Sequence, residues 1–391
     1  MSKVIVHIDL NAFFFRCEEI KDPSLENKAV AVGHDGRAGI VSTCSYKARE
    51  YGVHSAMPMN QAKKFCPQLI IKNDDYRFYM VKSHEFFNFV RSYVKDVEVA
   101  SCDECYADFT EATKGVTNLT KYFQDFQIKL FQKTKLKCSI GIANTRFLAK
   151  MGSDYRKPMG ITYIRKQDIP NILYPLPVKD IYGIGKKTAP KIEDLGIKTI
   201  GELVNKLESR DEELLKIIGK FDATLLESLR GEGEDKLYLD EWDPKSISAS
   251  TTLSEDTNNF EVIKDKFEEV VDEVAYRMNK EGKIGATIQI MVKDVEYKAH
   301  NHSFTLDTPT DNKQIILNTV LKLYERKYYG LVIRAVGVAV QNLIDRHDMN
   351  IQMTLFNYQE HEKESETKLL INDLNRKMKK NLLKRASEAK K

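Results

Sequence analysis

The chain of 391 residues has no apolar run long enough to cross a lipid bilayer. It begins Met1-Ser2-Lys3 and enters an apolar stretch at once, without the features of a signal peptide or a transit peptide. Long polar tracts are absent as well, and 42% of the residues are hydrophobic. We therefore expect a folded cytoplasmic protein that has no membrane partner.

Cysteine is scarce and scattered along the chain. The six cysteines are Cys17, Cys44, Cys66, Cys102, Cys105 and Cys138. This pattern predicts reduced thiols rather than a disulfide framework. Cys102 and Cys105 form a C-x-x-C pair, but no second pair and no nearby histidine completes a zinc site. We interpret both as small apolar side chains that flank neighbouring carboxylates.

A strong excess of one charge is also missing. The net charge is +4, which permits a nucleic-acid partner without proving one. The length of 391 residues exceeds that of one ordinary core and predicts two to four domains.

The first part of the chain predicts a sheet covered by helices. Apolar strand patterns cover residues 4–10, 40–43, 97–101, 106–109 and 138–143, and helical patterns cover 46–51, 59–65, 76–94, 116–134 and 145–153. Asn11 is predicted to cap a helix that follows the first strand directly. This order predicts a split βαβ sheet with a helical insertion after its first strand.

The second part changes character. Short helices are predicted from 176 to 230, and a charged linker with glycine and proline follows. Strands are predicted at 246–253, 285–293, 300–306 and 332–342, with helices at 261–280 and 312–327. The βαββαβ order predicts a separate four-stranded domain with helices on one face. From Asp345 onward no compact apolar pattern is left, and we expect a mobile tail.

Two acidic clusters carry most of the functional information. Asp9 lies near the end of the first strand, and Asp103 and Glu104 follow another strand about ninety residues later. Three carboxylates at strand ends of one sheet can hold two divalent metal ions for phosphoryl chemistry, and the carbonyl of Leu10 can add a ligand. Solvated acids at strand ends are common, and the spacing alone leaves nucleases and cyclases open.

Three consecutive aromatic residues, Phe13, Phe14 and Phe15, begin the helix beside this cluster. The three rings cannot all face one core. One interpretation is a buried helix start. The other is that one ring packs beneath the sugar of a bound nucleotide, where a 2′-hydroxyl would clash.

Two further motifs carry groups suited to phosphate. Tyr46 and Arg49 are three residues apart on a predicted helix, so they share one face. A guanidinium can bind phosphate oxygens through two hydrogen bonds. Lys157 precedes a Pro-x-Gly turn and can supply a point charge. Pairs such as Tyr46 and Arg49 are also common as surface decoration.

Taken in order, the motifs from Val4 to Phe356 resemble Y-family translesion DNA polymerases, most of all the DinB or DNA polymerase IV branch. The resemblance implies an α+β, right-hand-like polymerase with a ferredoxin-like palm at 1–10 and 76–165, small fingers at 11–75 and a helical thumb at 166–231. A linker at 232–244, a βαββαβ little finger at 245–344 and a tail at 345–391 would follow.

The family pattern implies roles for matching residues. Asp9, Asp103 and Glu104 would be the catalytic carboxylates. Together with Leu10 they would bind two Mg²⁺ ions, with Mn²⁺ as a possible replacement. Phe14 would be the steric gate against ribonucleotides. The residues that bind the nucleotide would be Phe13, Phe14, Thr43, Tyr46, Arg49 and Lys157.

Two positions depart from the family pattern. Asn11 stands where the family often has an acid, and Cys105 stands where a small apolar residue is usual. Neither position is a required ligand, so we expect activity to survive. A thiol beside the metals would offer Mn²⁺ or Zn²⁺ an inhibitory ligand.

Two segments are expected to contact DNA. Residues 181–186 have the pattern of a helix-hairpin-helix, whose glycines let backbone N–H groups approach a phosphate, although an ordinary glycine-rich turn is the alternative. The candidate contacts in this segment are Gly183, Gly185, Lys186 and Lys187. In the little finger the candidates are Lys293, His302 and Arg334.

The tail holds a candidate partner site. Residues 352–356 resemble the bacterial sliding-clamp peptide through Gln352, Met353, Leu355 and Phe356. The basic helical pattern at 362–389 is interpreted as a solvated helix, with DNA contact or a partner surface as alternatives.

The sequence thus predicts a monomeric, low-fidelity DNA polymerase without proofreading that takes primer-template DNA and dNTPs and is recruited by a clamp. The rival hypotheses are another two-metal phosphoryl transferase and a catalytically silent DNA-binding scaffold.

Overall fold

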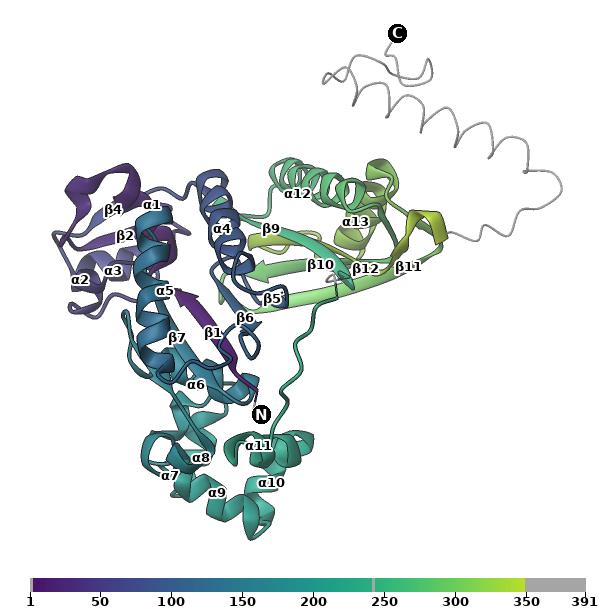
Figure 1. Cartoon of the computed structure of the whole chain (residues 1–391). Coiled ribbons are helices and arrows are strands. Elements are labelled where there is room, and N and C mark those ends of the chain that lie inside the picture. The colour runs from purple at the N-terminus through teal and green to yellow at the C-terminus, as the bar shows by residue number, and fades with distance from the viewer. Residues whose placement is uncertain (1–2, 241–242, 349–391) are drawn as a thin grey trace. The chain divides into compact units, whose positions relative to one another are not determined.

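The computed structural model describes residues 3–240 and 243–348, and Figure 1 labels the helices and strands. The chain divides into two units, Met1–Glu241 and Trp242–Lys391, which are described separately. Among the described residues, no helix has both the length and the apolar character that a membrane span requires.

Five strands form the main sheet of the first unit. Their order is β5 (Val97–Val99), β6 (Glu104–Asp108), β1 (Ile5–Leu10), β7 (Cys138–Ala143) and β8 (Ile161–Tyr163). β1 is central and pairs antiparallel with both β6 and β7. The predicted strands 4–10, 97–101, 106–109 and 138–143 are present, and β8 is an addition of three residues that periodicity did not reveal.

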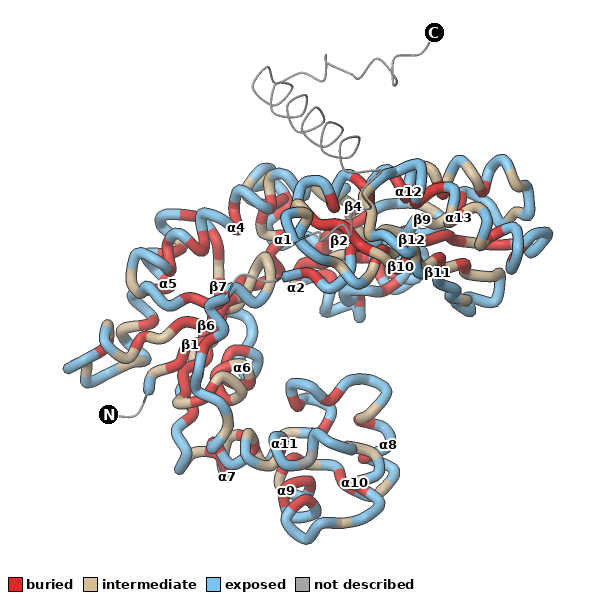
Figure 2. The backbone as a smooth tube through the Cα atoms, turned by 90° about the vertical axis from the view of Figure 1, so that its right-hand side faces the viewer, coloured by how far each residue is buried: buried red, intermediate tan, exposed pale blue. Residues whose placement is uncertain are grey.

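Helices cover both faces of this sheet. Alternation along β1 sends Val6, Ile8 and Leu10 into a core with α4 (Tyr76–Arg91) and α5 (Leu119–Thr134). Ile5 joins a second core with α6 (Arg146–Tyr155) on the other face. In Figure 2, β1 and β7 are mostly red, because their residues are buried. The face that carries Asp9 is therefore the one that meets α6.

A smaller three-stranded sheet follows β1 in the chain. Its order is β3 (Val41–Cys44), β2 (Val30–Gly33) and β4 (Ile70–Lys72). Four helical segments accompany it: α1 (Phe13–Lys21), the 3-10 turn η1 (Pro23–Leu25), α2 (Tyr46–Arg49) and α3 (Met59–Phe65). The sequence predicted β3, α2 and α3 but missed β2 and β4. These two strands have four and three residues, so they offer little alternation to recognise.

The first unit ends in short helices, as predicted. They are η2 (Lys166–Asp168), α7 (Ile169–Ile172), η3 (Val178–Asp180), α8 (Ala189–Asp194), α9 (Ile200–Glu208), α10 (Glu212–Ile218), η4 (Gly219–Phe221) and α11 (Asp222–Leu229). Their apolar residues share one core with α6, so they are packed on the helix that faces Asp9.

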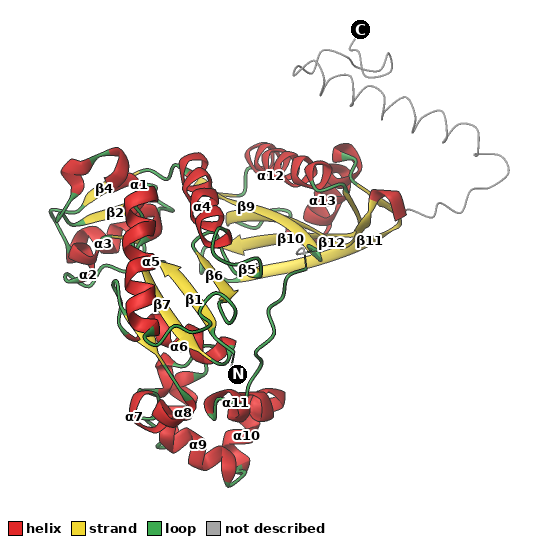
Figure 3. Cartoon of the chain, in the orientation of Figure 1, coloured by secondary structure: helices red, strands yellow, loops and turns green. Residues whose placement is uncertain are grey.

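The second unit has the predicted βαββαβ order. Its strands are β9 (Ser246–Thr257), β10 (Lys283–Asp294), β11 (Ala299–Thr310) and β12 (Ile333–Asp345), arranged β11-β10-β12-β9, and a short turn η5 (Arg346–Asp348) follows. The helices α12 (Phe260–Lys280) and α13 (Lys313–Tyr328) cover one face of the sheet (Figure 3). The other face carries small and polar side chains.

One glycine decides how closely α6 approaches the main sheet. Gly141 lies in β7 directly opposite His7 of β1. A Cβ atom placed on Gly141 would lie 1.8 Å from the carbonyl oxygen of Ala149 and 2.4 Å from the backbone nitrogen of Ser153. Only glycine permits this approach.

We predict that Gly141→Ala destabilises the protein by about 3 kcal/mol, because the added methyl group forces backbone away from backbone. Thermal unfolding of the full chain measures the loss. Gly185→Ala is the control, since a Cβ atom there would meet no atom within 4 Å. Equal melting temperatures for the two variants would contradict the packing argument.

Candidate active site

Strand register brings two of the predicted carboxylates together. Asp9 of β1 lies directly opposite Glu104 of β6, so the two side chains are on the same face of the sheet. Asp103 lies in the turn just before β6, and its carbonyl oxygen accepts a hydrogen bond of 2.9 Å from the backbone N–H of Leu10. All three acids therefore lie at one end of the β1–β6 pair.

Two lysines reach into this cluster from α6 and the turn after it. Nζ of Lys150 lies 2.6 Å from Oε2 of Glu104 and 3.3 Å from Oδ2 of Asp9. Nζ of Lys157 lies 2.7 Å from the same oxygen of Asp9. Asp154 contacts both lysines, at 3.5 and 2.7 Å. Of Lys150, Asp154 and Lys157, sequence analysis assigned a role to Lys157 only. The spacing of Lys150 and Asp154, four residues apart on one helix, could have indicated that these two side chains pair.

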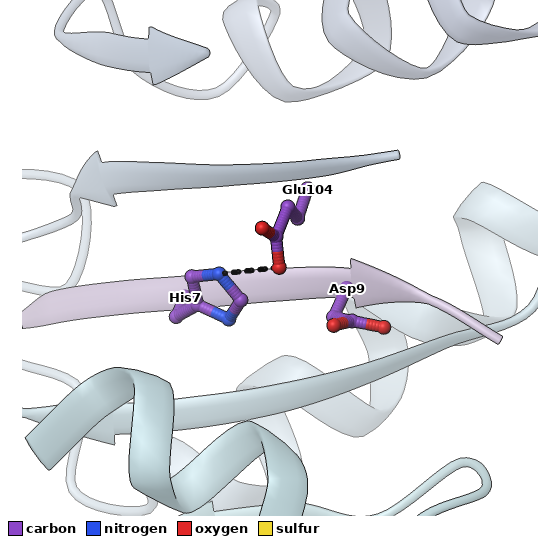
Figure 4. A group of neighbouring side chains, drawn as sticks. All are labelled: His7, Asp9 and Glu104. Carbon is purple, nitrogen blue, oxygen red and sulfur yellow. Dashed lines mark ion pairs between the residues drawn. The ribbon is translucent and has the colours of Figure 1, made fainter. Parts of the chain in front are cut away.

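A histidine that sequence analysis did not single out lies against the same carboxylates. His7 is 0% exposed, and its Nε2 is 3.3 Å from Oε2 of Glu104 (Figure 4). Its Nδ1 is 2.8 Å from Oγ of Ser153 on α6. Burial lowers the pKa of His7. The available signal was its position two residues before Asp9, which puts both side chains on one strand face.

The electrostatics of Asp103 and Glu104 differ. Burial raises the pKa of Asp103, and the negative charges of Asp9 and Glu104 add to this effect. The contacts of Glu104 with His7 and then with Lys150 hold its pKa well below the ordinary value and outweigh its burial. Of these two carboxylates, Asp103 is the one whose charge the surrounding protein compensates less.

A cavity of about 240 Å³ opens beside the cluster. It brings together most of the residues to which sequence analysis gave metal-binding or nucleotide-binding roles. Its lining contains Asp9, Leu10, Phe13, Phe14, Thr43, Tyr46, Arg49, Asp103 and Lys157, together with Ala12, Ser42 and Ser55. Glu104 is not part of the lining and is paired with Lys150.

The aromatic residues that border the cavity have different surroundings. Phe13 is 2% exposed and belongs to the core. Phe14 is partly exposed and stacks on Tyr79, with ring centroids 4.6 Å apart and planes 14° from parallel. Phe14 therefore presents a supported ring to the cavity. On the other side, the guanidinium of Arg49 lies 4.7 Å from the ring centre of Tyr46.

The prediction that Asn11 caps the following helix is wrong. α1 begins at Phe13, its N-cap residue is Ala12, and no side chain caps it. Asn11 is buried and accepts a hydrogen bond of 2.8 Å from the backbone N–H of Met159 through Oδ1. Its Nδ2 donates to Oγ of Ser139 at 2.9 Å. The amide thus ties the turn that follows Lys157 to β7.

Neither Cys102 nor Cys105 lines the cavity. Cys105 alternates with Glu104 along β6, so it points into the opposite core and is 0% exposed. Burial raises the pKa of Cys102 to about 11, and its Sγ lies 4.0 Å from Oδ1 of Asp103. All six cysteines are free. Cys105 packs as an apolar side chain, as the sequence suggested.

Comparison with known proteins identifies the family. Residues 8–154 match the model of the impB/mucB/samB family, and residues 244–355 match the C-terminal domain of that family. Residues 166–197 match a model described as the IMS family HHH motif. The chain is 35% identical to DNA polymerase IV of Bacillus velezensis, over 100% of this chain and 94% of that protein. DNA polymerase IV 1 of Bacillus subtilis is also 35% identical, with the same coverage.

The chain belongs to the Y family of DNA polymerases. Among solved structures, the Y-family chimera Dbh-Dpo4(243-245)-Dbh matches with a TM-score of 0.77 and 24% identity, covering 88% of this chain and 99% of that one. An insertion ternary complex of Dbh DNA polymerase matches with a TM-score of 0.60 and 25% identity, with the same coverage. The Y-family membership and the multidomain α+β fold predicted from the sequence are confirmed.

Family membership makes this Y-family chain a DNA-directed DNA polymerase of the lesion-bypass type. It also implies catalysis that depends on divalent metal ions. The individual site residues and the domain bounds stay predictions.

The helix-hairpin-helix of this Y-family chain lies between η3 and α8. Gly183 has a φ of +95°, which only glycine adopts readily. Gly185 is exposed, and a Cβ atom there would meet no atom within 4 Å. Lys186 and Lys187 are exposed next to it. Backbone and positive charge are thus open on one side of the hairpin.

The three candidate DNA contacts of the second unit lie in different surroundings. Lys293 alternates with Val292, which is buried under the helices, and so it lies on the uncovered face of the sheet. His302 lies opposite Ile290 on the helix-covered face and is 2.5 Å from the hydroxyl oxygen of Tyr328. Arg334 packs 4.4 Å from the ring centre of Tyr297. The uncovered face is hollowed by about 330 Å³, lined by Ser248, Ala249, Ser250, Gln289, Met291, Gly337, Val338 and Ala339.

The clamp-peptide prediction, with Gln352, Met353, Leu355 and Phe356, lies outside the described residues, as does the predicted basic helix at 362–389.

We predict that Asn11→Ala raises the KM for nucleotide about fivefold and changes kcat less. Loss of the bond to Met159 costs about 1 kcal/mol and lets the turn with Lys157 relax. Steady-state kinetics measures the split. Asn11→Asp is expected to restore KM, because a carboxylate accepts the same N–H. Asn118→Ala is the control, since it removes a helix-cap hydrogen bond elsewhere. An equal change of KM in that variant would contradict the claim that Asn11 positions the turn with Lys157.

Proposed function

We propose that this Y-family polymerase adds deoxynucleotides to a primer 3′ end at Asp9, Asp103 and Glu104, with a template and dNTPs bound at the adjacent cavity. The observation that carries the proposal is the β1–β6 register, which places Asp9 opposite Glu104 at the strand ends, beside a cavity lined by the candidate triphosphate ligands.

The residues present suit two Mg²⁺ ions. The ammonium groups of Lys150 and Lys157 face four carboxylates, those of Asp9, Asp103, Glu104 and Asp154, so negative charge is left over. Asp103 carries a pKa raised by burial, and a nearby dication would relieve that cost. Asp9, Asp103, Glu104 and the carbonyl of Leu10 would hold the ions. When bound, such ions favour deprotonation of an attacking hydroxyl and neutralise a leaving pyrophosphate; Mn²⁺ can replace Mg²⁺.

The cationic and phenolic side chains would hold the triphosphate. Arg49 can bind two phosphate oxygens with its planar guanidinium, and the ring of Tyr46 holds that guanidinium in place. The hydrogen bond between Asn11 and the backbone N–H of Met159 holds the turn that follows Lys157 against the sheet. The ammonium group of Lys157 therefore has a fixed position at the cavity. Thr43 offers a hydroxyl from β3.

Phe14 would act as the gate against ribonucleotides. Its stacking on Tyr79 keeps the ring from turning away when a sugar approaches. A 2′-hydroxyl on the bound sugar would collide with this face, so discrimination would come from shape rather than from a hydrogen bond.

DNA would be held without regard to sequence. The exposed backbone at Gly183 and Gly185, with Lys186 and Lys187, would contact phosphates. Lys293, His302 and Arg334 would contribute from the little finger. We further propose that the enzyme is a cytoplasmic monomer of low fidelity, that it lacks proofreading, and that a sliding clamp recruits it through residues 352–356.

Asp103→Asn is expected to abolish primer extension while DNA affinity stays within about twofold, because the change removes a metal ligand but no phosphate contact. The same variant should melt at a higher temperature in the absence of metal, since the raised pKa of Asp103 means that its charge opposes folding above that pKa. Extension, gel-shift and melting assays test this. Asp125→Asn, an exposed change on α5, is the control. Cleavage of DNA by the wild type in place of extension would favour the nuclease rival.

Phe14→Ala is expected to raise incorporation of ribonucleotides relative to deoxynucleotides by about a hundredfold or more, because removal of a steric clash worth about 3 kcal/mol changes a rate ratio by that much. Single-nucleotide insertion with dNTP and rNTP measures the ratio. Phe14→Tyr keeps the ring and is the control. Unchanged discrimination in Phe14→Ala would assign the gate to another residue.

A further inference from the structure

His7 takes no part in the function proposed above, yet it is fully buried against the carboxylate cluster. It precedes Asp9 by two residues on β1, so the two side chains leave the strand on the same face. Figure 4 shows its ring beside the carboxylates of Glu104 and Asp9. A buried polar ring in this place requires an explanation in terms of its partners.

The hydroxyl of Ser153 determines which ring nitrogen of His7 carries hydrogen. Oγ of Ser153 donates its single hydrogen to the backbone carbonyl of Lys150, at 2.8 Å. The same oxygen lies 2.8 Å from Nδ1 of His7, and it must therefore accept a hydrogen from that nitrogen. The neutral imidazole consequently has a lone pair on Nε2.

This lone pair faces other lone pairs. Nε2 makes no hydrogen bond with any described residue, although it is 3.3 Å from Oε2 of Glu104. One potential ligand atom from each of His7, Asp9 and Glu104 lies within 4.8 Å of the others. The ammonium group of Lys150 contacts both carboxylate oxygens, and a dication in its place would be within reach of the imidazole nitrogen as well.

We propose that His7, Asp9 and Glu104 form a nitrogen-containing site for a transition-metal dication such as Zn²⁺ or Mn²⁺. These ions accept imidazole as a ligand, whereas Mg²⁺ prefers oxygen. The hydrogen bond from Nδ1 to Ser153 is the outer contact that orients most metal-binding histidines. The further metal ligand beside the carboxylates is therefore the imidazole of His7 and not the thiol of Cys105, which is buried on the opposite face.

The ammonium group of Lys150 occupies the place that such an ion would take. Its Nζ lies 2.6 Å from Oε2 of Glu104 and 3.3 Å from Oδ2 of Asp9, so an incoming dication displaces the ammonium group. Asp154, 3.5 Å away, can retain it. The site shares Asp9 and Glu104 with the proposed catalytic cluster and rests on the proposed function in that respect. Zn²⁺ bound through His7 would withdraw both carboxylates from nucleotide addition and so inhibit it.

Pulsed EPR of bound Mn²⁺ tests the ligand set directly. The metal-free full-length chain is loaded with one equivalent of Mn²⁺, and coupling to an imidazole ¹⁴N nucleus is measured. The wild type is expected to show this coupling and His7→Phe to lose it. His84→Phe, which changes an exposed histidine on α4, is the matched control and should keep it. A wild-type spectrum with oxygen ligands only, or a coupling that persists in His7→Phe, would overturn the proposal.

Calorimetric titration with Zn²⁺ and with Mg²⁺ gives a second readout. His7→Phe should weaken Zn²⁺ binding about tenfold or more, as expected when one of three protein ligands is lost, and leave Mg²⁺ binding within about twofold. Equal weakening for both ions would indicate a merely structural role. If His7→Phe does not fold, the wild-type EPR spectrum alone decides. Neither measurement requires DNA synthesis, so failure of the proposed polymerase mechanism and failure of the metal site are distinguishable.

Discussion

The pairing of Asp9 with Glu104 across β1 and β6 is the constraint on which the rest of the site depends. A register shift of one residue would turn Asp9 into the apolar core with α4 and α5 and bring Ile8 or Leu10 to the α6 face. The alternation of β1 prevents such a shift, because Val6, Ile8 and Leu10 are almost completely buried on the opposite face. The alternation of apolar residues along β1 therefore both stabilises the sheet and determines which face carries Asp9.

The close packing of α6 on β7 supplies the charges that hold those carboxylates. Because Gly141 lets the helix backbone approach the strand, Lys150 and Ser153 reach across to β1 and β6. The chain then turns after α6, and Asn11 ties that turn to β7, so that Lys157 reaches Asp9 as well. One glycine and one amide thus determine the positions of two ammonium groups.

Much of the fold and part of the candidate site were predictable from the sequence. The central strands, the long helices, the βαββαβ unit and the three acids follow from apolar periodicity and from the places where it is interrupted. β2, β4 and β8 were missed, although β3 and β5 are equally short and were recognised, so a length of three or four residues leaves the assignment to the flanking sequence. His7 and the roles of Lys150 and Asn11 were missed for another reason. Their partners Ser153, Glu104 and Met159 are distant in sequence and become neighbours only through sheet register and helix docking.

The lysines also explain how a cluster of acids can fold before any ion arrives. Burial of a carboxylate favours its protonation, and the repulsion between neighbouring carboxylates adds to this effect; both raise the pKa of Asp103. Salt bridges from Lys150 and Lys157 offset this repulsion at Glu104 and Asp9 and leave Asp103 without a comparable partner. The protein therefore compensates the acids only in part, and the uncompensated charge lies at the cavity, on the carboxylate best placed to attract a dication together with a triphosphate.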